Sequence, residues 1–213
     1  MRTYGQYCAI AKALDLVGDR WTLLVVRELM LRGPCRYTDL RNGLPGVATN
    51  LLAERLRDLE EAGVVSREEA PPPVATTLFK LTSRGEELAP VLRGLLDWGT
   101  PLMVEGPAPD DVFMSQWLKW PAEMALADRD PGAPPVRIQV LADGEPALLE
   151  TSEGSVRFAL GRAEDPDAVL SGPAHTVLGL LTGHVDLDGA GAMGLEYDGE
   201  RAALERVLPD LTA

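Results

Sequence analysis

Hydrophobic positions recur with a helical period between residues 48 and 60. Three leucines in this stretch lie at positions i, i+4 and i+7, and so share one face of a 3.6-residue helix: Leu52, Leu56 and Leu59. A Gly/Pro-rich turn at 43–46 separates this helix from a short one that begins near residue 36. Gly63 occupies the position that commonly ends a helix in a left-handed conformation. The pattern predicts a helix-turn-helix.

Two strand-like segments follow the second helix. Residues 64–68 and 76–81 are rich in β-forming side chains. Three consecutive prolines at 71–73 cannot donate ladder hydrogen bonds, so we expect them in a protruding loop. A β-hairpin after a helix-turn-helix predicts a winged helix, whose second helix can enter the major groove of DNA. An ordinary helical hairpin would share the leucine pattern.

Three more helices are predicted around this motif. Residues 8–16 and 20–31 form two of them, and residues 83–103 form the third, with Pro90 tolerated in its first turns. Four leucines make the apolar face of the third helix: Leu88, Leu92, Leu95 and Leu96. We expect this helix, which carries Trp98, to join two subunits into a homodimer. The alternative is that it packs entirely within its own subunit.

The second half of the chain has an α+β pattern. An amphipathic helix with a kink or restart at Pro121 is predicted near its beginning. Short strands are expected at 137–141, 147–150, 155–159 and 168–170, with a hairpin turn at 143–144, helices at 175–181 and 201–208, and a strand or turn at 194–197. Proline and glycine at 105–110 indicate a linker between two domains, residues 1–104 and 110–213.

The first domain resembles the HxlR-type winged helix-turn-helix regulators of bacteria. The matching motifs lie between about residues 5 and 103: LVGDRWTLLVVREL (16–29), RYTDL (36–40), LPGVATNLLAERLRDLE (44–60), LTSRGEELAPVL (81–92) and DWG (97–99). The resemblance implies a dimeric, sequence-specific transcription factor whose two recognition helices read successive major grooves of a double-stranded operator. Repression is the expected output and activation the alternative.

Seven residues are candidates for DNA contacts. Thr49 and Asn50 begin the recognition helix, where side chains reach base edges. The other five candidates are basic or polar residues expected to contact phosphate, base or DNA backbone: Arg36, Thr38, Arg55, Arg57 and Arg67. The wing carries Glu68 and Glu69 where basic residues are expected, which argues against insertion of the wing into the minor groove.

The second domain, over roughly 110–210, resembles sterol-carrier-protein type 2-like domains. The resemblance rests on the runs DAVLSGPAHTVLGLLTG (167–183) and GLEYDG (194–199). It implies a β-sheet packed against helices around an apolar tunnel, and here a sensor for a small apolar or amphipathic effector. Six residues could form its walls: Phe113, Trp117, Trp120, Met124, Leu178 and Leu181. Alternatively these residues are ordinary core, or the domain serves only dimerisation or partner contact.

The distribution of charged residues also changes near the predicted domain boundary. Residues 1–100 carry 13 basic and 13 acidic side chains, whereas residues 101–213 carry 7 and 20, which accounts for the net charge of −13. The acidic half would repel phosphates, so a DNA-binding surface is expected in the first half. No apolar stretch is long enough to span a bilayer and no signal-peptide pattern is present, so we expect a soluble cytoplasmic protein with no membrane partner.

The remaining chemistry is sparse. Cys8, near the start of the first helix, lies where some HxlR-like regulators place a redox-sensing cysteine, but Cys-Ala-Ile replaces their usual Cys-Pro opening, and a buried inert thiol is the alternative. Cys35 lies at the edge of the DNA-binding motif. His175 and His184 lack metal-ligand spacing, and no hydrolase or nucleotide-binding motif occurs. We therefore expect neither an enzyme nor a cofactor.

Two other functions compete with a ligand-responsive regulator. The chain could be a small-molecule carrier or enzyme accessory protein that uses the winged helix only for dimerisation. It could also be a thiol redox-sensing regulator that responds through Cys8.

Overall fold

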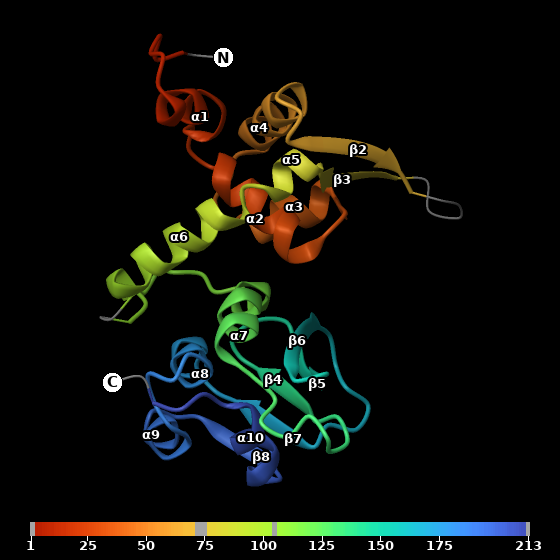
Figure 1. Cartoon of the computed structure of the whole chain (residues 1–213), viewed down its shortest axis with the longest axis vertical. Coiled ribbons are helices and arrows are strands. Elements are labelled where there is room, and N and C mark those ends of the chain that lie inside the picture. Colours follow the sequence, from red (N-terminus) through yellow and green to blue (C-terminus); the bar gives the residue numbers. More distant parts are fainter. Residues whose placement is uncertain (1–2, 71–75, 104–105, 212–213) are drawn as a thin grey trace. The chain divides into compact units, whose positions relative to one another are not determined.

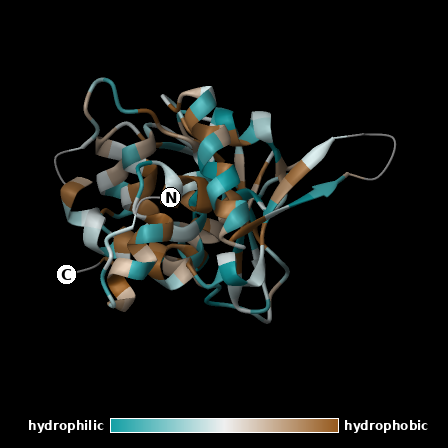
Figure 2. Cartoon of the chain, turned by 90° about the horizontal axis from the view of Figure 1, so that it is seen from above, coloured by the Kyte–Doolittle hydropathy of each residue, from teal (hydrophilic) through white to brown (hydrophobic). Residues whose placement is uncertain are grey.

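A computed structural model describes residues 3–70, 76–103 and 106–211 of the chain (Figure 1). Contacts between residues divide the chain into two compact units, Met1–Glu105 and Gly106–Ala213. Helices of both units mix hydrophobic and hydrophilic positions (Figure 2), as expected for helices that bury one face. Among the described residues, no helix has both the length and the apolar character needed to cross a membrane.

The first unit combines helices with a small antiparallel sheet. Its helical elements are α1 (Ala9–Val17), α2 (Thr22–Arg32), α3 (Tyr37–Gly43), α4 (Thr49–Glu61), α5 (Ser83–Glu86), α6 (Ala89–Gly99) and the 3₁₀ turn η1 (Thr100–Met103). Its strands are β1 (Cys35–Arg36), β2 (Val65–Glu69) and β3 (Thr77–Leu81), in the order β1-β3-β2. The predicted winged helix-turn-helix is confirmed, but the proline loop at 71–73 lies outside the described residues.

The leucine period of α4 builds the core of this unit. Leu52, Leu56 and Leu59 are each at most 1% exposed, and they share the core with buried residues of α2, including Val25 and Leu29. Gly63 ends the helix with φ of 69°, and the N–H of Val64 donates to the Leu59 carbonyl at 2.9 Å. This left-handed glycine turns the chain directly into β2, as the sequence predicted.

The helix predicted over 83–103 is wrong as a single element. Thr82 caps α5 by accepting a hydrogen bond from the Gly85 N–H at 3.2 Å, but α5 ends at Glu86 and α6 begins at Ala89. The break arises because Pro90 has no N–H and its ring clashes with the carbonyl four residues earlier. Pro90 therefore starts a new helix instead of lying inside an existing one.

The second unit contains a five-stranded sheet with helices. Its strands are β4 (Arg137–Leu141), β5 (Ala147–Ser152), β6 (Ser155–Leu160), β7 (Ala168–Ser171) and β8 (Glu196–Gly199), in the order β6-β5-β4-β7-β8. Strands β4 and β7 pair in parallel and the other neighbours are antiparallel. Its helical elements are η2 (Ser115–Leu118), α7 (Lys119–Ala125), α8 (Ala174–Leu181), α9 (Leu187–Ala192) and α10 (Arg201–Val207).

Most sequence-predicted elements of this unit are confirmed within a few residues. The hairpin expected at 143–144 joins β4 to β5, and Asp143 also accepts a hydrogen bond from the N–H of Ala174 at the start of α8. The amphipathic helix expected near the start of this unit is wrong in extent, since η2 is a 3₁₀ turn and only α7 is α-helical. Helix α9 was not predicted, because its six residues are too few to show a period.

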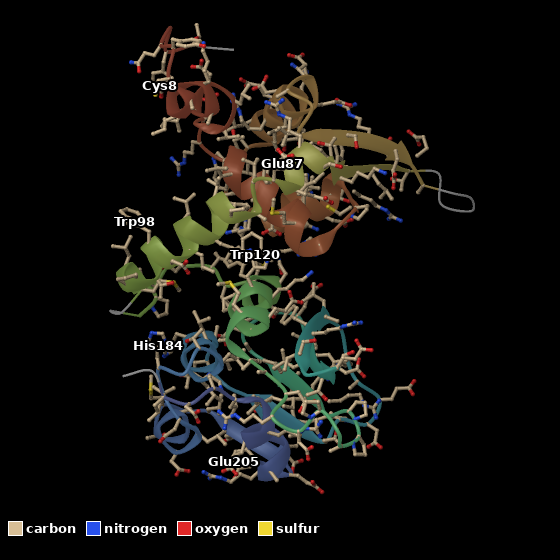
Figure 3. The ribbon with its side chains drawn as sticks, in the orientation of Figure 1. Cys8, Glu87, Trp98, Trp120, His184 and Glu205 are labelled. Carbon is tan, nitrogen blue, oxygen red and sulfur yellow. The ribbon has the colours of Figure 1, made fainter. Side chains whose placement is uncertain are left out.

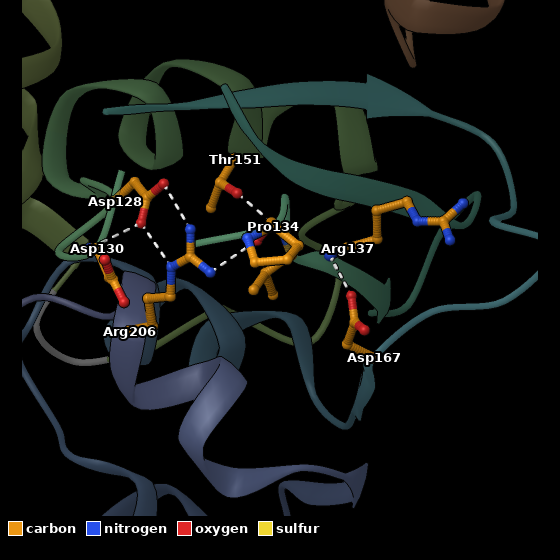
Figure 4. A network of polar contacts seen from close by, with 8 residues as sticks. Asp128, Asp130, Pro134, Arg137, Thr151, Asp167 and Arg206 are labelled. Carbon is orange, nitrogen blue, oxygen red and sulfur yellow. Dashed lines mark hydrogen bonds and ion pairs between the residues drawn. The ribbon is translucent and has the colours of Figure 1, made fainter. Parts of the chain in front are cut away.

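A buried ion pair fixes a loop of the second unit to α10. Arg206 donates to both carboxylate oxygens of Asp128, at 2.6 and 2.9 Å, and to the Pro134 carbonyl at 2.8 Å (Figure 4). These hydrogen bonds lower the pKa of Asp128 below its usual value. The pair therefore remains ionised at neutral pH and holds the loop that leads into β4.

Candidate nucleic-acid interface and other predicted sites

The side of α4 opposite its leucines is polar and accessible. Thr49 and Asn50, which open the helix, are exposed, and so is Arg57 two turns later. Because Leu52, Leu56 and Leu59 anchor the other side in the core, this polar side cannot turn inward without exposing them. A rigid helix with a free polar face has the geometry that major-groove recognition requires.

The N-terminal end of α4 is fixed by a hydrogen bond from α3. The Tyr37 hydroxyl donates to the backbone carbonyl of Thr49 at 2.7 Å. Helix α3 is itself started by Asp39, whose carboxylate accepts from the Arg36 N–H at 2.9 Å. Arg36 and Thr38 are exposed at this end of α3.

A buried carboxylate of α2 lies against the end of α3. Glu28 is 0% exposed and forms ion pairs with Arg27 at 2.9 Å and Arg32 at 3.2 Å. Gly43, the last residue of α3, lies so close that a Cβ atom there would overlap the Glu28 carboxylate. A side chain at this position would therefore have to displace the Glu28 carboxylate.

Arg55 does not lie where we expected a DNA contact. The residue is only 8% exposed, and its guanidinium pairs with Asp19, with Glu54 at 2.5 Å and with Asp58 at 3.1 Å. A contact with phosphate would require a guanidinium free of these three carboxylates, so the placement argues against the expected role. The helical period could have indicated this burial, because position 55 follows Leu52 by three residues and precedes Leu59 by four and so lies near the buried face of α4.

The wing carries ion pairs of its own. Arg67 is about half exposed, pairs with Glu60 at 2.8 Å and lies over the Phe79 ring at 5.2 Å. Glu68 pairs with Lys80 on the neighbouring strand, and Glu69 accepts a hydrogen bond from the Thr77 hydroxyl at 3.0 Å. The acidic side chains of β2 therefore stabilise the hairpin by cross-strand pairs, and Arg67 contributes at its base.

The six residues predicted as ligand-binding walls have different environments. Leu181 is 0% exposed in the core, and Phe113 and Leu178 pack against that core. Phe113 and Trp117 form an edge-to-face pair with ring centroids 6.4 Å apart, and Trp120 is partly buried. Met124 is 51% exposed, so it does not enclose a ligand site within this unit. Leu181 lies in the packed core of the second unit in this structure.

A cavity of about 260 Å³ opens elsewhere in the second unit, and none of the six predicted wall residues lines it. Its lining combines leucines with arginines and carboxylates: Leu180, Leu187, Leu208, Arg129, Arg201 and Glu205 are among them. The two arginines are engaged in ion pairs, Arg129 with Asp210 at 2.9 Å and Arg201 with Asp188 at 3.0 Å. Its lining therefore mixes apolar and charged side chains.

The two cysteines differ in reactivity. Cys8 is exposed at the N-terminal end of α1, where the nearby backbone N–H groups of Ala11 and Ile10 lower the pKa of its thiol (Figure 3). Burial raises the pKa of the Cys35 thiol to about 12, with a further contribution from the Asp39 carboxylate. Cys8 is thus the more reactive thiol, because the thiolate is the nucleophile.

The family assignment rests on the first unit. The family model of the HxlR-like helix-turn-helix matches residues 16–106. YvaP, an HTH-type transcriptional regulator of Bacillus subtilis, is 37% identical over 89 residues, which are 42% of this chain and 82% of that protein. The Synechocystis HTH-type transcriptional regulator sll1512 is 40% identical over 88 residues, which are 41% of this chain and 64% of that protein.

The solved structures include the reduced form of the transcriptional regulator YodB from B. subtilis. It is 29% identical, with a TM-score of 0.41 over 48% of this chain and 100% of that chain. The family model and the extensive match to YvaP agree on one assignment. The chain belongs to the HxlR-like helix-turn-helix family.

Proposed function

We propose that the chain is a sequence-specific DNA-binding transcriptional regulator in which α4 enters the major groove. One observation carries the proposal: α4 begins with exposed Thr49 and Asn50 while its leucines are locked in the core. Membership of a family whose relatives are HTH-type transcriptional regulators supports the same function. Repression is the proposed output.

The proposed contacts follow from exposure. Thr49 and Asn50 approach base edges, and Arg57 contacts phosphate or base. Arg36, Thr38 and Arg67 flank the helix and contact the DNA backbone. Arg55 leaves this set because three carboxylates surround its guanidinium.

The regulator acts as a homodimer through α6 and η1. Four large apolar side chains of this segment follow the spacing i, i+4, i+7 and i+11 and are 45% to 74% exposed: Val91, Leu95, Trp98 and Leu102. A similar exposed set lies near the beginning of the unit: Ile10 and Leu14 of α1, and Tyr7 just before this helix. A second copy of this chain suits these surfaces, because two copies place two α4 helices on paired half-sites.

Arg57→Ala should weaken binding to DNA and flatten its salt dependence. If Arg57 meets a phosphate, its loss lowers the slope of log affinity against log salt by about one. Fluorescence anisotropy with labelled DNA from the region flanking the gene, at several salt concentrations, measures both quantities. Arg162→Ala removes an exposed arginine of the second unit and should leave the slope unchanged. An unchanged slope for Arg57→Ala removes Arg57 from the phosphate contacts.

We further propose that the second unit senses a small apolar or amphipathic effector, as its sterol-carrier-like sequence pattern implies. Its sheet packed with helices and its cavity, whose lining includes leucines, support this role. Effector binding should shift operator affinity by about 1–3 kcal/mol. Native mass spectrometry of protein purified from its own host tests the proposal: a copurified lipophilic compound supports it, and mass equal to the bare chain contradicts it.

A thiol response is the second candidate function, and the exposure of Cys8 at a helix N-terminal end favours it. Cys8→Ser should abolish any loss of operator binding caused by peroxide or quinone, since serine cannot be oxidised or alkylated in this way. Anisotropy titrations with and without oxidant measure the response. Cys35→Ser should leave it intact, because Cys35 is buried with a raised pKa. A wild-type protein insensitive to both reagents contradicts this function.

A further inference from the structure

Arg55 connects the recognition helix to the corner between α1 and α2. Its side chain is 10% exposed and its ion-pair partner Asp19 lies in that corner, 36 positions earlier in the sequence. Glu54 and Asp58, on α4 itself, complete the set of carboxylates around it. Of the three partners, only Asp19 belongs to another element, so it is the one that can fix α4 relative to its surroundings.

The corner that supplies Asp19 has a constrained backbone. Trp21 adopts a left-handed conformation with φ of 78°, which non-glycine residues rarely accept. A Cβ atom at Gly18 would approach the Leu14 carbonyl oxygen at 2.5 Å, so the chain passes tightly over the end of α1. The Trp21 ring reaches within 3.9 Å of the Cβ position of Gly46, in the turn before α4. The corner thus borders α4 at its middle and at its preceding turn.

The charges around Arg55 make it a poor anchor for phosphate. One guanidinium faces three carboxylates, of which Asp19 and Glu54 are 69% and 54% exposed. The local balance is therefore negative, and phosphate would have to displace partners already within ion-pair distance. The Arg55 side chain is buried in the helix-turn-helix, whereas Asp19 and Glu54 lie at its surface.

We propose that Arg55 is a positioning residue: through Asp19 it sets the rotation and depth of α4 and so determines operator specificity without touching DNA. The inference rests on the proposed DNA-binding function. A positioning role and a contact role for Arg55 predict opposite changes in DNA affinity when the ion pair with Asp19 is removed. If Arg55 were a phosphate contact, releasing it from Asp19 would strengthen DNA binding. If Arg55 positions α4, releasing it weakens operator binding.

Asp19→Asn makes this distinction in the full-length chain. The variant removes one negative charge, so electrostatics alone predicts tighter binding to every DNA. Positioning predicts that operator affinity falls about tenfold, within the range of coupling between contacting residues, while affinity for nonspecific DNA stays equal or rises. The ratio of affinity for operator DNA to affinity for nonspecific DNA is the readout, because a general loss of stability would not change it. Circular dichroism spectra at the assay temperature verify that the variant is folded.

Glu61→Gln is the matched control, because Glu61 is exposed at the end of α4 and its change removes the same charge. It should leave operator affinity equal or higher. Arg55→Lys retains a cation but not the fork geometry, and should also lower the specificity ratio, with an effect that does not add to that of Asp19→Asn. Tighter operator binding by Asp19→Asn, or additive effects of the two variants, would overturn the proposal. Absence of operator binding by the wild type would instead defeat the DNA-binding function itself.

Discussion

Gly43→Ala should abolish operator binding by disrupting the junction of α2 and α3. The added methyl group would overlap the carboxylate of Glu28, which is fully buried and held by Arg27 and Arg32. Displacing the carboxylate would disturb its ion pairs with these arginines, and full loss of a buried ion pair costs about 3–5 kcal/mol. Either α3 moves or the network breaks, and both displace the turn that leads into α4.

Thermal unfolding and anisotropy titration measure the two consequences. Unfolding of the first unit should shift to lower temperature by at least several degrees, and operator affinity should fall more than a hundredfold. Gly191→Ala makes the same chemical change in α9, where a Cβ atom would meet nothing within 4 Å, and should behave as wild type. If the Gly43→Ala variant has wild-type stability and affinity, Glu28 and its two arginines can rearrange to accommodate the methyl group, and the prediction is wrong.

Replacing both Leu95 and Trp98 by glutamate should produce a monomer. The two side chains are 45% and 74% exposed, so the subunit can fold without them. In a dimer, the new carboxylates would be desolvated without partners and would repel their symmetry mates. Operator affinity should fall more than a hundredfold, because a monomer loses the second half-site.

Sedimentation equilibrium and the operator titration test this prediction together. Arg93→Glu introduces the same side chain at an exposed position of α6 that lies two residues from Val91, on a different face. It should remain dimeric. A dimeric double variant with unchanged operator affinity would place the subunit contact elsewhere.

The helix-turn-helix could be predicted because its residues carry local signals. Leu52, Leu56 and Leu59 repeat with the period of a helix, and Gly63 takes the left-handed conformation that only glycine adopts without strain. The strands of the second unit were predicted for the same reason, since β-formers cluster between turn residues. Helix periods, glycine positions and clusters of β-forming residues can all be read from residues that are close together in the sequence.

Features set by tertiary contacts could not be predicted in the same way. Trp21 was expected inside a helix, but it adopts a left-handed conformation just before α2, with its ring near the turn before α4. The role of Arg55 depended on Asp19, whose distance in sequence hides the pair. The burial of Leu181 could not be predicted either, because an apolar residue in a sequence can line a cavity or fill a core.

The most direct test is a footprint and titration of DNA flanking the gene with wild-type protein and a Thr49→Ala/Asn50→Ala variant. Both residues are exposed at the start of α4, so the variant should fold as wild type. The account predicts protection of two half-sites about one helical turn apart by the wild type, and loss of this specific protection in the variant. Absence of any specific footprint, or one that the double substitution leaves unchanged, would contradict recognition by α4 and favour a carrier or accessory role for the chain.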